Sequence, residues 1–203
     1  MKILIIGATG TIGKEITKLS KERGDTVITA SRKGDPSINI DDPATLDNYF
    51  SNASALDAII CVAGNASFGK FIDMTDDQIK LGINSKLLGQ VNLVKKGLEK
   101  LNPGGVIILT GGILAYTPWP ETSNIAMVNA GLEGFVKAAA LELDNEKRVV
   151  IVHPPLVRET ADAMGMDSAP WPSASTVAKT YISSIENLSN GSTVFVEGYN
   201  PRG

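Results

Sequence analysis

The chain of 203 residues is poor in the residues that build disulfides and metal sites, since it holds one cysteine, Cys61, and one histidine, His153. A single cysteine excludes an intramolecular disulfide, and these two residues are too few for a zinc site of the usual Cys/His kind. No apolar run approaches the roughly 20 residues that span a bilayer. The formal net charge is −3, so no basic excess favours nucleic acid or an anionic membrane. These absences exclude disulfide-stabilised, zinc-binding and membrane-spanning classes.

What remains is the composition of a globular domain, 43% hydrophobic and 20% charged. A chain of this length suits one domain, so we expect a single domain over residues 1–203. Met1 and Lys2 lead directly into an apolar run without the pattern of a signal peptide, and we therefore expect a cytoplasmic protein.

The most informative stretch is Ile3 to Gly13, ILIIGATGTIG. Its apolar start predicts a buried parallel strand, and the apolar spacing after it predicts a helix. This succession of strand, glycine turn and helix is typical of dinucleotide-binding proteins, in which the pyrophosphate lies at the helix N-terminus. An ordinary strand–helix turn is the alternative, although one glycine would usually suffice for it. The expected cofactor-binding residues are Gly7, Thr9, Gly10, Thr11, Ile12 and Gly13.

The residues after the second expected strand, Asp25 to Ala30, indicate which cofactor is bound. NAD-binding folds place an acidic residue there for the ribose 2′-hydroxyl, whereas arginine suits a 2′-phosphate. This chain has Ser31 and Arg32 instead of an acid, which favours NADP(H) over NAD(H). A solvated loop is the alternative. Asp41 is expected either to bind the adenine amino group or to cap a helix.

The rest of the chain alternates strands with helices, which predicts an α/β, three-layer, doubly wound Rossmann fold. We expect a parallel sheet of about seven strands with helices on both faces. The further strands are expected at Ser37 to Ile40, Leu56 to Val62, Val106 to Leu109, Arg148 to Val152 and Thr193 to Val196. The helices are expected at Thr11 to Arg23, Asp42 to Phe50, Thr75 to Leu101, Ser123 to Asp144 and Ser175 to Leu188.

Two further stretches are unusual for their place in this pattern. Gly82, Gly89 and Gly97 are roughly aligned in the long helix, which indicates either close approach by another backbone, such as a second subunit, or tolerated glycine at exposed positions. The segment from Leu156 to Pro172 has no regular pattern and carries methionines, which suits a mobile lid over a small-molecule site.

Residues 1 to 199 together resemble the short-chain dehydrogenase/reductase family. The resemblance rests on GATGTIG, on CVAG at Cys61 to Gly64, on the helix around Asn84, and on NAGLEGFVKAAALEL at Asn129 to Leu143. It implies NADP or NAD binding, interconversion of alcohols and carbonyls, and a homodimer or homotetramer formed through the two long helices. It also implies cofactor contacts at Ala63, Gly64, Asn129 and Pro154.

The family's catalytic set is a tyrosine, a lysine four residues later, a serine after the fifth strand and a supporting asparagine. Aligning on LEGF at Leu132 to Phe135 leaves only the asparagine, Asn84, in place. The tyrosine, lysine and serine positions hold Ile125, Asn129 and Gly111 or Gly112. An isoleucine cannot exchange protons, an asparagine carries no charge, and a glycine offers only its backbone.

Polar residues nearby offer replacements for the missing groups, and the candidate catalytic residues are Asn84, Tyr116 and Asn129. Tyr116 is a candidate proton donor, or simply an aromatic packed in a proline-rich loop. Asn129 can hydrogen-bond the nicotinamide ribose. His153 is either a proton shuttle or a structural residue. Three hydroxyls can also polarise a carbonyl: Thr110, Thr117 and Ser123.

Two hypotheses of different classes follow. The first is an NADP(H)-dependent oxidoreductase with a non-standard active site, acting on a small carbonyl or alcohol. The second is a non-catalytic NADP(H)-binding sensor or scaffold. A lyase, epimerase or isomerase ranks third. We expect no nucleic-acid partner, no membrane partner and no metal.

Overall fold

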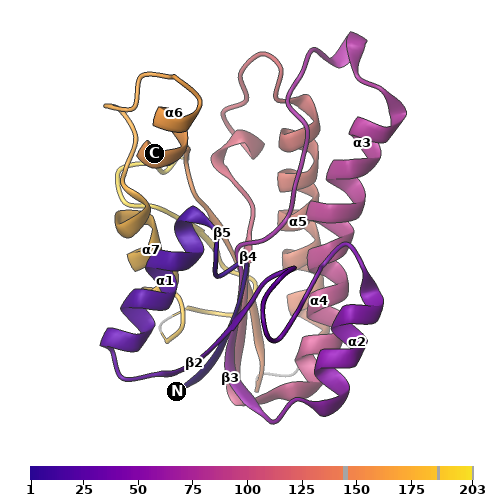
Figure 1. Ribbon diagram of the computed structural model, residues 1–203, viewed down its shortest axis with the longest axis vertical. Helices are drawn as coiled ribbons and strands as arrows, with labels where there is room; N and C mark the ends of the chain where they lie inside the picture. The colour runs from indigo at the N-terminus through magenta and orange to yellow at the C-terminus, as the bar shows by residue number, and fades with distance from the viewer. Residues whose placement is uncertain (144–145, 187, 203) are drawn as a thin grey trace.

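The computed structural model, shown in Figure 1, describes residues 1–143, 146–186 and 188–202. One parallel sheet of six strands has the order β2-β1-β3-β4-β5-β6. The chain proceeds from β1 to β2 on one side of β1, and then crosses to β3 on its other side. A doubly wound sheet opens a crevice at its carboxyl edge where the strand order reverses in this way. The strands are β1 (Lys2–Ile6), β2 (Thr26–Ala30), β3 (Leu56–Cys61), β4 (Leu101–Thr110), β5 (Arg148–His153) and β6 (Thr193–Phe195).

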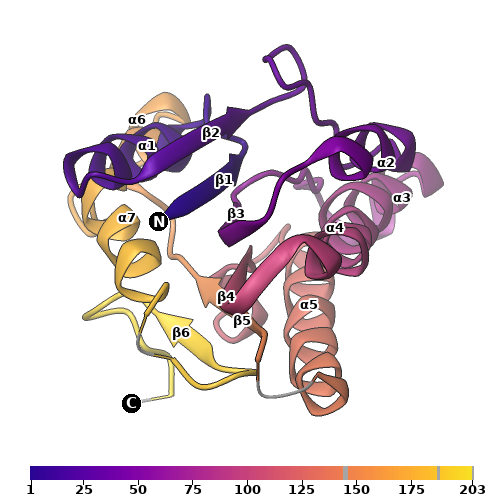
Figure 2. The same ribbon diagram turned by 90° about the horizontal axis from the view of Figure 1, so that it is seen from below.

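Helices cover both faces of this sheet, as predicted. Figure 2 shows α1 (Thr11–Glu22), α6 (Arg158–Ala163) and α7 (Ala174–Ser183) on one side. The other side carries α2 (Pro43–Asn52), α3 (Asp76–Gly82), α4 (Gly89–Gly97) and α5 (Ser123–Glu142). Alternate residues of each strand supply the two cores: in β1, Ile3 and Ile5 face one cluster and Leu4 and Ile6 the other. A strand buried on both faces therefore has a continuous apolar sequence.

The expected strand from Ser37 to Ile40 is wrong, and the sheet has six strands instead of about seven. Only Ser37 pairs, through an isolated bridge to Ser31. Ile38 and Ile40 still reach the core, with 2% and 4% of their surface exposed. The Thr45 hydroxyl bonds both the N–H of Asn39, at 3.0 Å, and its carbonyl, at 2.8 Å. That side chain takes the backbone groups that a neighbouring strand would need.

The long helix predicted from Thr75 to Leu101 begins as expected, because Thr75 and Gln78 form a capping box. It is not uniform, however: a π-helix at Ile83–Leu88 separates α3 from α4, and a 3₁₀ turn at Leu98–Lys100 ends it. Strand β4 then begins at once, at Leu101 instead of Val106. A π-helical turn shifts the angular position of side chains relative to an α-helix.

The three glycines of this helical run are buried against the chain itself. A Cβ at Gly82 would lie 2.3 Å from Asn124 Oδ1, and one at Gly89 would lie 2.9 Å from the Ile40 carbonyl oxygen. Gly97 faces Ile59 of the sheet at 2.7 Å. Close packing against other parts of the same chain therefore explains these glycines. Neither a second subunit nor solvent exposure is needed to account for them.

One other helix boundary differs from the prediction, and another falls outside the described residues. Helix α5 is described as far as Glu142, and its expected end, Asp144, is not among the described residues. Helix α7 ends at Ser183 instead of Leu188. The segment expected to be irregular contains α6, and its Trp171 packs edge-on against Trp119, with ring centroids 5.8 Å apart.

The described helices include none that is both long and apolar enough to cross a membrane.

Candidate functional site

The β1–α1 turn requires glycine because backbone segments meet there. Gly7 has a φ of +87°, and a Cβ on it would lie 2.9 Å from the Val62 carbonyl group. A Cβ on Gly13 would lie 2.1 Å from the Gly7 carbonyl oxygen. Helix α1 then begins without a side-chain cap at Gly10 and without an acidic residue in its first turn. Its first N–H groups are therefore left for an anion.

A first pocket of about 250 Å³ lies over this turn, at the carboxyl ends of β1, β2 and β3. Eight of the residues expected to bind cofactor line it: Gly7, Thr9, Gly10, Ser31, Arg32, Asp41, Ala63 and Gly64. Six other residues line it that were not predicted from the sequence: Ile38, Asn39, Ile40, Val62, Asn65 and Ser85. The first three belong to the segment that was wrongly predicted as a strand. That wrong prediction therefore accounts for half of the residues that were not predicted to line the pocket.

Two charged residues of opposite sign, Arg32 and Asp41, line the first pocket. Arg32 is exposed and takes part in none of the ion pairs found in the described part of the chain. Asp41 lines the pocket, whereas the neighbouring Asp42 caps α2 by accepting from the Ala44 N–H at 3.0 Å. Of the two roles left open for Asp41, the structure thus gives the helix cap to its neighbour.

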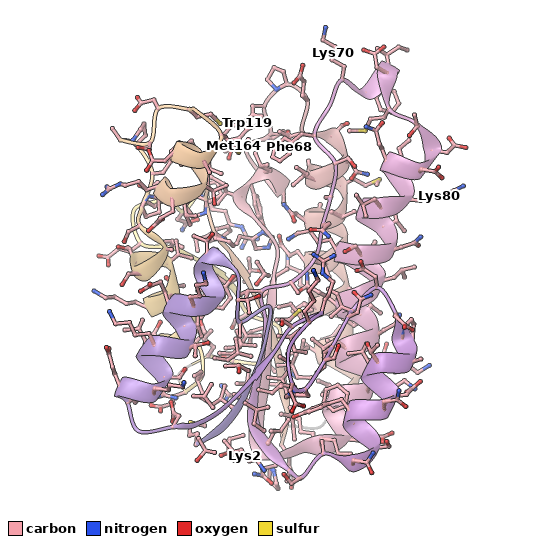
Figure 3. All side chains as sticks on the ribbon, in the orientation of Figure 1. Lys2, Phe68, Lys70, Lys80, Trp119 and Met164 are labelled. Atoms are coloured by element: carbon pink, nitrogen blue, oxygen red, sulfur yellow. The ribbon has the colours of Figure 1, made fainter. Side chains whose placement is uncertain are left out.

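A second pocket of about 340 Å³ continues from the first, and Gly64 and Asn65 line both. Besides Gly64, three expected cofactor residues line it, namely Ile12, Asn129 and Pro154. Phe68 and Trp119, labelled in Figure 3, also line it. Thr11 and Gly13 line neither pocket: Thr11 is an exposed first residue of α1, and Gly13 is a packing residue under the turn.

The positions expected for the family's catalytic residues all line the second pocket: Ile125, Asn129, Gly111 and Gly112. Close neighbours leave the two glycines no room for a side chain. A Cβ on Gly111 would lie 2.6 Å from His153 Cε1, and a Cβ on Gly112 would lie 2.7 Å from Asn129 Nδ2. A serine at either position therefore collides with its present neighbour.

Asn129 presents an acceptor that the described protein does not satisfy. Its Nδ2 donates to the Gly112 carbonyl at 3.5 Å, whereas its buried Oδ1 has no partner among the described residues. A buried amide oxygen without a donor is costly and usually finds a ligand or water. This orphaned atom fits a hydroxyl donor such as a ribose.

Tyr116, the expected proton donor, does not line the second pocket. Its hydroxyl donates to Glu133 and accepts from the Arg202 guanidinium. Its ring packs edge-on against His153 and Phe195, with centroids 5.5 and 5.3 Å away. Burial raises the pKa of Tyr116, and the bond to Glu133 raises it further. The structure thus favours the packing alternative for this residue.

His153 is fully buried and belongs to the same polar cluster. Its Nδ1 bonds the backbone of Gly112, and its Nε2 lies 3.5 Å from Glu133 Oε2. Burial lowers the pKa of His153, although the Gly112 bond and Glu133 oppose the shift. A buried, neutral imidazole that does not line the pocket matches the structural alternative.

The remaining hydroxyl candidates are also engaged or displaced. Thr110 donates to the Cys61 carbonyl at 2.6 Å and lies 2.8 Å from the Tyr181 hydroxyl. Thr117 donates to the Ile113 carbonyl. Ser123 lines a separate apolar pocket beside Phe71.

Asn84, the one family residue in place by sequence, has an exposed side chain and lines neither pocket. The π-helix turns its two successors inward instead. Ser85 lines the first pocket and accepts from the Asn65 N–H at 2.9 Å, and Lys86 lines the second. Counting along an ideal α-helix could not reveal this exchange. Among the described residues, no group of three His, Cys, Asp or Glu side chains is placed to hold a metal ion.

The chain resembles characterised reductases along most of its length. The model of the enoyl-(acyl carrier protein) reductase family matches residues 7–182. A 3-oxoacyl-(acyl-carrier-protein) reductase of Rickettsia conorii is 29% identical over 157 residues, covering 69% of this chain and 65% of the relative. A 3-ketodihydrosphingosine reductase of Bacteroides thetaiotaomicron is 28% identical over 162 residues, covering 70% and 58%. The matched part of the chain thus spans less than two thirds of the length of each of these relatives.

Two solved structures match nearly the whole chain. A protein of Listeria innocua is 32% identical with a TM-score of 0.90, covering 97% of this chain and 99% of its own. A small-chain dehydrogenase in complex with NADPH is 29% identical with a TM-score of 0.89, covering 100% and 99%. With the glycine turn and the matching pocket positions, these likenesses show that the chain belongs to the short-chain dehydrogenase/reductase family.

Proposed function

We propose that this protein is an NADP(H)-dependent oxidoreductase with a non-standard active site, acting on a small carbonyl or alcohol. The observation that carries the proposal is the continuity of the two pockets through Gly64 and Asn65. A dinucleotide laid along them would reach from Arg32 to Asn129. Reductases among the relatives and an NADPH-bound structural neighbour support the same reading.

The chain's own residues suggest how such a cofactor would be held. The free N–H groups of α1 suit the pyrophosphate, and Arg32 with Ser31 suits the 2′-phosphate. The orphaned Oδ1 of Asn129 suits a hydroxyl of the nicotinamide ribose. When bound, the nicotinamide supplies or accepts the hydride, and the protein orients the substrate beside it.

The first test is a titration of the pure protein with NADPH and NADH, followed by nicotinamide fluorescence. We expect NADPH to bind at micromolar concentration and more tightly than NADH. NADPH consumption is then measured with a panel of small aldehydes, ketones and enones. Failure to bind either nucleotide would remove the basis of the proposal.

A non-catalytic sensor is the second candidate, and one observation favours it: Ile125 and Gly112 leave the usual positions without a proton donor. It predicts tight NADPH binding without turnover of any compound in the panel. It also predicts a protein partner whose capture differs with and without NADPH. Indistinguishable captures would count against it.

The expected homodimer or homotetramer stays a prediction, as does the cytoplasmic location. Leu81, Leu88 and Met127 lie on the two long helical stretches and expose 41%, 45% and 46% of their surface. Such side chains suit contact with a second copy. Light scattering coupled to size-exclusion chromatography measures the oligomeric state directly.

A further inference from the structure

Lys86 is the only ionisable side chain among the described residues that line the second pocket. It comes from the π-helix between α3 and α4 and is half-buried. Its backbone packs on the cofactor-facing edge of the sheet: a Cβ on Gly64 would lie 3.0 Å from Lys86 Cα. Because Gly64, with a φ of +130°, has no side chain, the helix can pack closely enough to place Lys86 beside the second pocket. π-Helical turns occur frequently at functional sites.

The Lys86 ammonium faces no carboxylate. It takes part in none of the ion pairs found in the described part of the chain. The ionisable groups that act on it are Cys61 of β3 and His153 of β5. Burial raises the pKa of the Cys61 thiol to about 11 and lowers the pKa of His153, so both are neutral near pH 7. Lys86 is therefore the charge in this pocket.

No other lining group is suited to protonate a substrate. The Thr110 hydroxyl is spent on the Cys61 carbonyl. Ile125 and Gly112 carry no exchangeable side-chain proton, and the Asn129 amide does not ionise. Burial lowers the pKa of Lys86 to about 8. The ammonium thus predominates at neutral pH and yet releases its proton readily, which is the compromise that general acids require.

We infer that Lys86 is the proton donor of this active site and replaces the absent tyrosine from a different helix. The inference rests on the proposed oxidoreductase function. In the reductive direction, the carbonyl carbon gains a hydride from reduced nicotinamide, which is oxidised. The electron pair of the broken C–O π bond takes a proton from Lys86 Nζ. Solvent then returns a proton to the neutral amine.

The test compares the wild type with Lys86→Met, which keeps the length of the side chain, and Lys86→Arg, which keeps the charge but cannot release a proton near neutral pH. Lys80→Met is the matched control, since Lys80 lies on the same helical run and points outward in Figure 3. Three quantities are measured for each: NADPH affinity, the pH profile of carbonyl reduction, and the titration of isotope-labelled lysines by NMR.

We expect Lys86→Met to bind NADPH within about threefold of wild type and to lose about 100-fold or more in kcat, as loss of a general acid does. Lys86→Arg should be similarly slow. The wild-type kcat should fall as pH rises through about 8, where the lysine loses its proton. One NMR resonance should titrate there and be missing from Lys86→Met, while Lys80→Met should match wild type in all three quantities.

Several outcomes would overturn the inference. If Lys86→Met turns over within a few-fold of wild type, or if every lysine titrates near the ordinary value, Lys86 is not the donor. A raised KM with unchanged kcat would make it an anchor for an anionic substrate instead. These failures leave NADPH binding and wild-type turnover intact. Loss of either in the wild type itself would instead remove the proposed function, and this inference with it.

Discussion

Under the proposed function, the two pockets form one groove, whose cofactor end is the first pocket and whose substrate end is the second. The two ends differ in how freely their residues can vary. At the end beneath the first pocket, the chain keeps the family's glycine turn, and collisions of backbone with backbone explain why. At the other end, Ile125, Asn129 and Gly112 line the pocket at the positions where the alignment expects the family's catalytic side chains. A turn whose backbone lies in contact with neighbouring backbone has room only for glycine at those positions. Side chains that meet across a pocket can change, provided that their neighbours change with them.

The substrate end shows such a compensation. His153 occupies the space that a side chain on Gly111 would need, and Asn129 does so for Gly112. Behind them, Glu133 binds Tyr116, Lys137 and Arg202. Gly111 and Gly112 thus belong to a closely packed layer, in which neither glycine can gain a side chain unless its neighbour changes.

Gly13→Ala should break the cofactor end with the largest effect. The new Cβ would lie 2.1 Å from the Gly7 carbonyl oxygen, and neither backbone can yield without moving the turn. We expect a loss of about 3 kcal/mol or more in the free energy of unfolding, at or above the usual range for overpacking. Urea denaturation and NADPH titration measure the two consequences.

Its control is Gly134→Ala, in α5, where a Cβ would meet no atom within 4 Å. Alanine there should stabilise the protein by about 1 kcal/mol, since glycine is a poor helix former. Equal melting temperatures for the two variants would contradict the role given to Gly13.

Glu133→Gln should disturb the layer behind the substrate end. Burial on its own would raise the pKa of Glu133, but hydrogen bonds from Lys137 and Tyr116 together lower it to about 2. The carboxylate therefore contributes about 3 kcal/mol at neutral pH. That stability is fully present above the unfolded pKa of 4.5 and is lost as pH falls towards about 2.

Urea unfolding of wild type and Glu133→Gln is compared at neutral pH and across that acid range. We expect the variant to be less stable at neutral pH and the difference to shrink on acidification. A constant difference at every pH would mean that Glu133 acts through packing and not through its charge.

Arg32→Ala should sharpen the contrast by weakening one cofactor and not the other. Loss of charged hydrogen bonds to a 2′-phosphate costs about 1.5 to 3 kcal/mol, or about 10- to 100-fold in affinity. We expect that loss for NADPH and none for NADH, measured by fluorescence titration. Lys18→Ala, at an exposed position of α1, is the control. Equal losses for both nucleotides would contradict the assignment.

Gly112→Ser should have the smallest effect and tests whether the family serine can simply be restored. Its Cβ would press on Asn129 Nδ2 at 2.7 Å, the end of a side chain that can partly yield. We expect a loss of about 1 to 2 kcal/mol and no gain in turnover. The double variant with Asn129→Ala should recover most of the stability. An additive double variant would show that the two positions are not coupled.

Predictions from the sequence succeeded where the structure depends on interactions between residues close together in the chain. Ile3–Ile6 and the glycines after it predicted the strand, the turn and the start of α1, because each depends on neighbours within a few residues. The prediction failed at Ser37 to Ile40, where apolar alternation is correct for burial but the Thr45 hydroxyl takes the backbone groups. The sequence also indicates Asn84 as a site residue, whereas its neighbours Ser85 and Lys86 line the pockets, because a π-helical turn leaves no mark in the spacing of apolar residues.

By itself, the sequence determined the doubly wound class, the glycine turn and the cation after β2. Each follows from residue type and short-range spacing. Only the tertiary structure decided what surrounds Ile125, Asn129 and Gly112. Arg202 meets Tyr116 across 86 positions of the chain, and Lys86 enters the pocket through a shifted helical turn. Contacts between distant segments depend on how the whole core packs, and no local pattern encodes them.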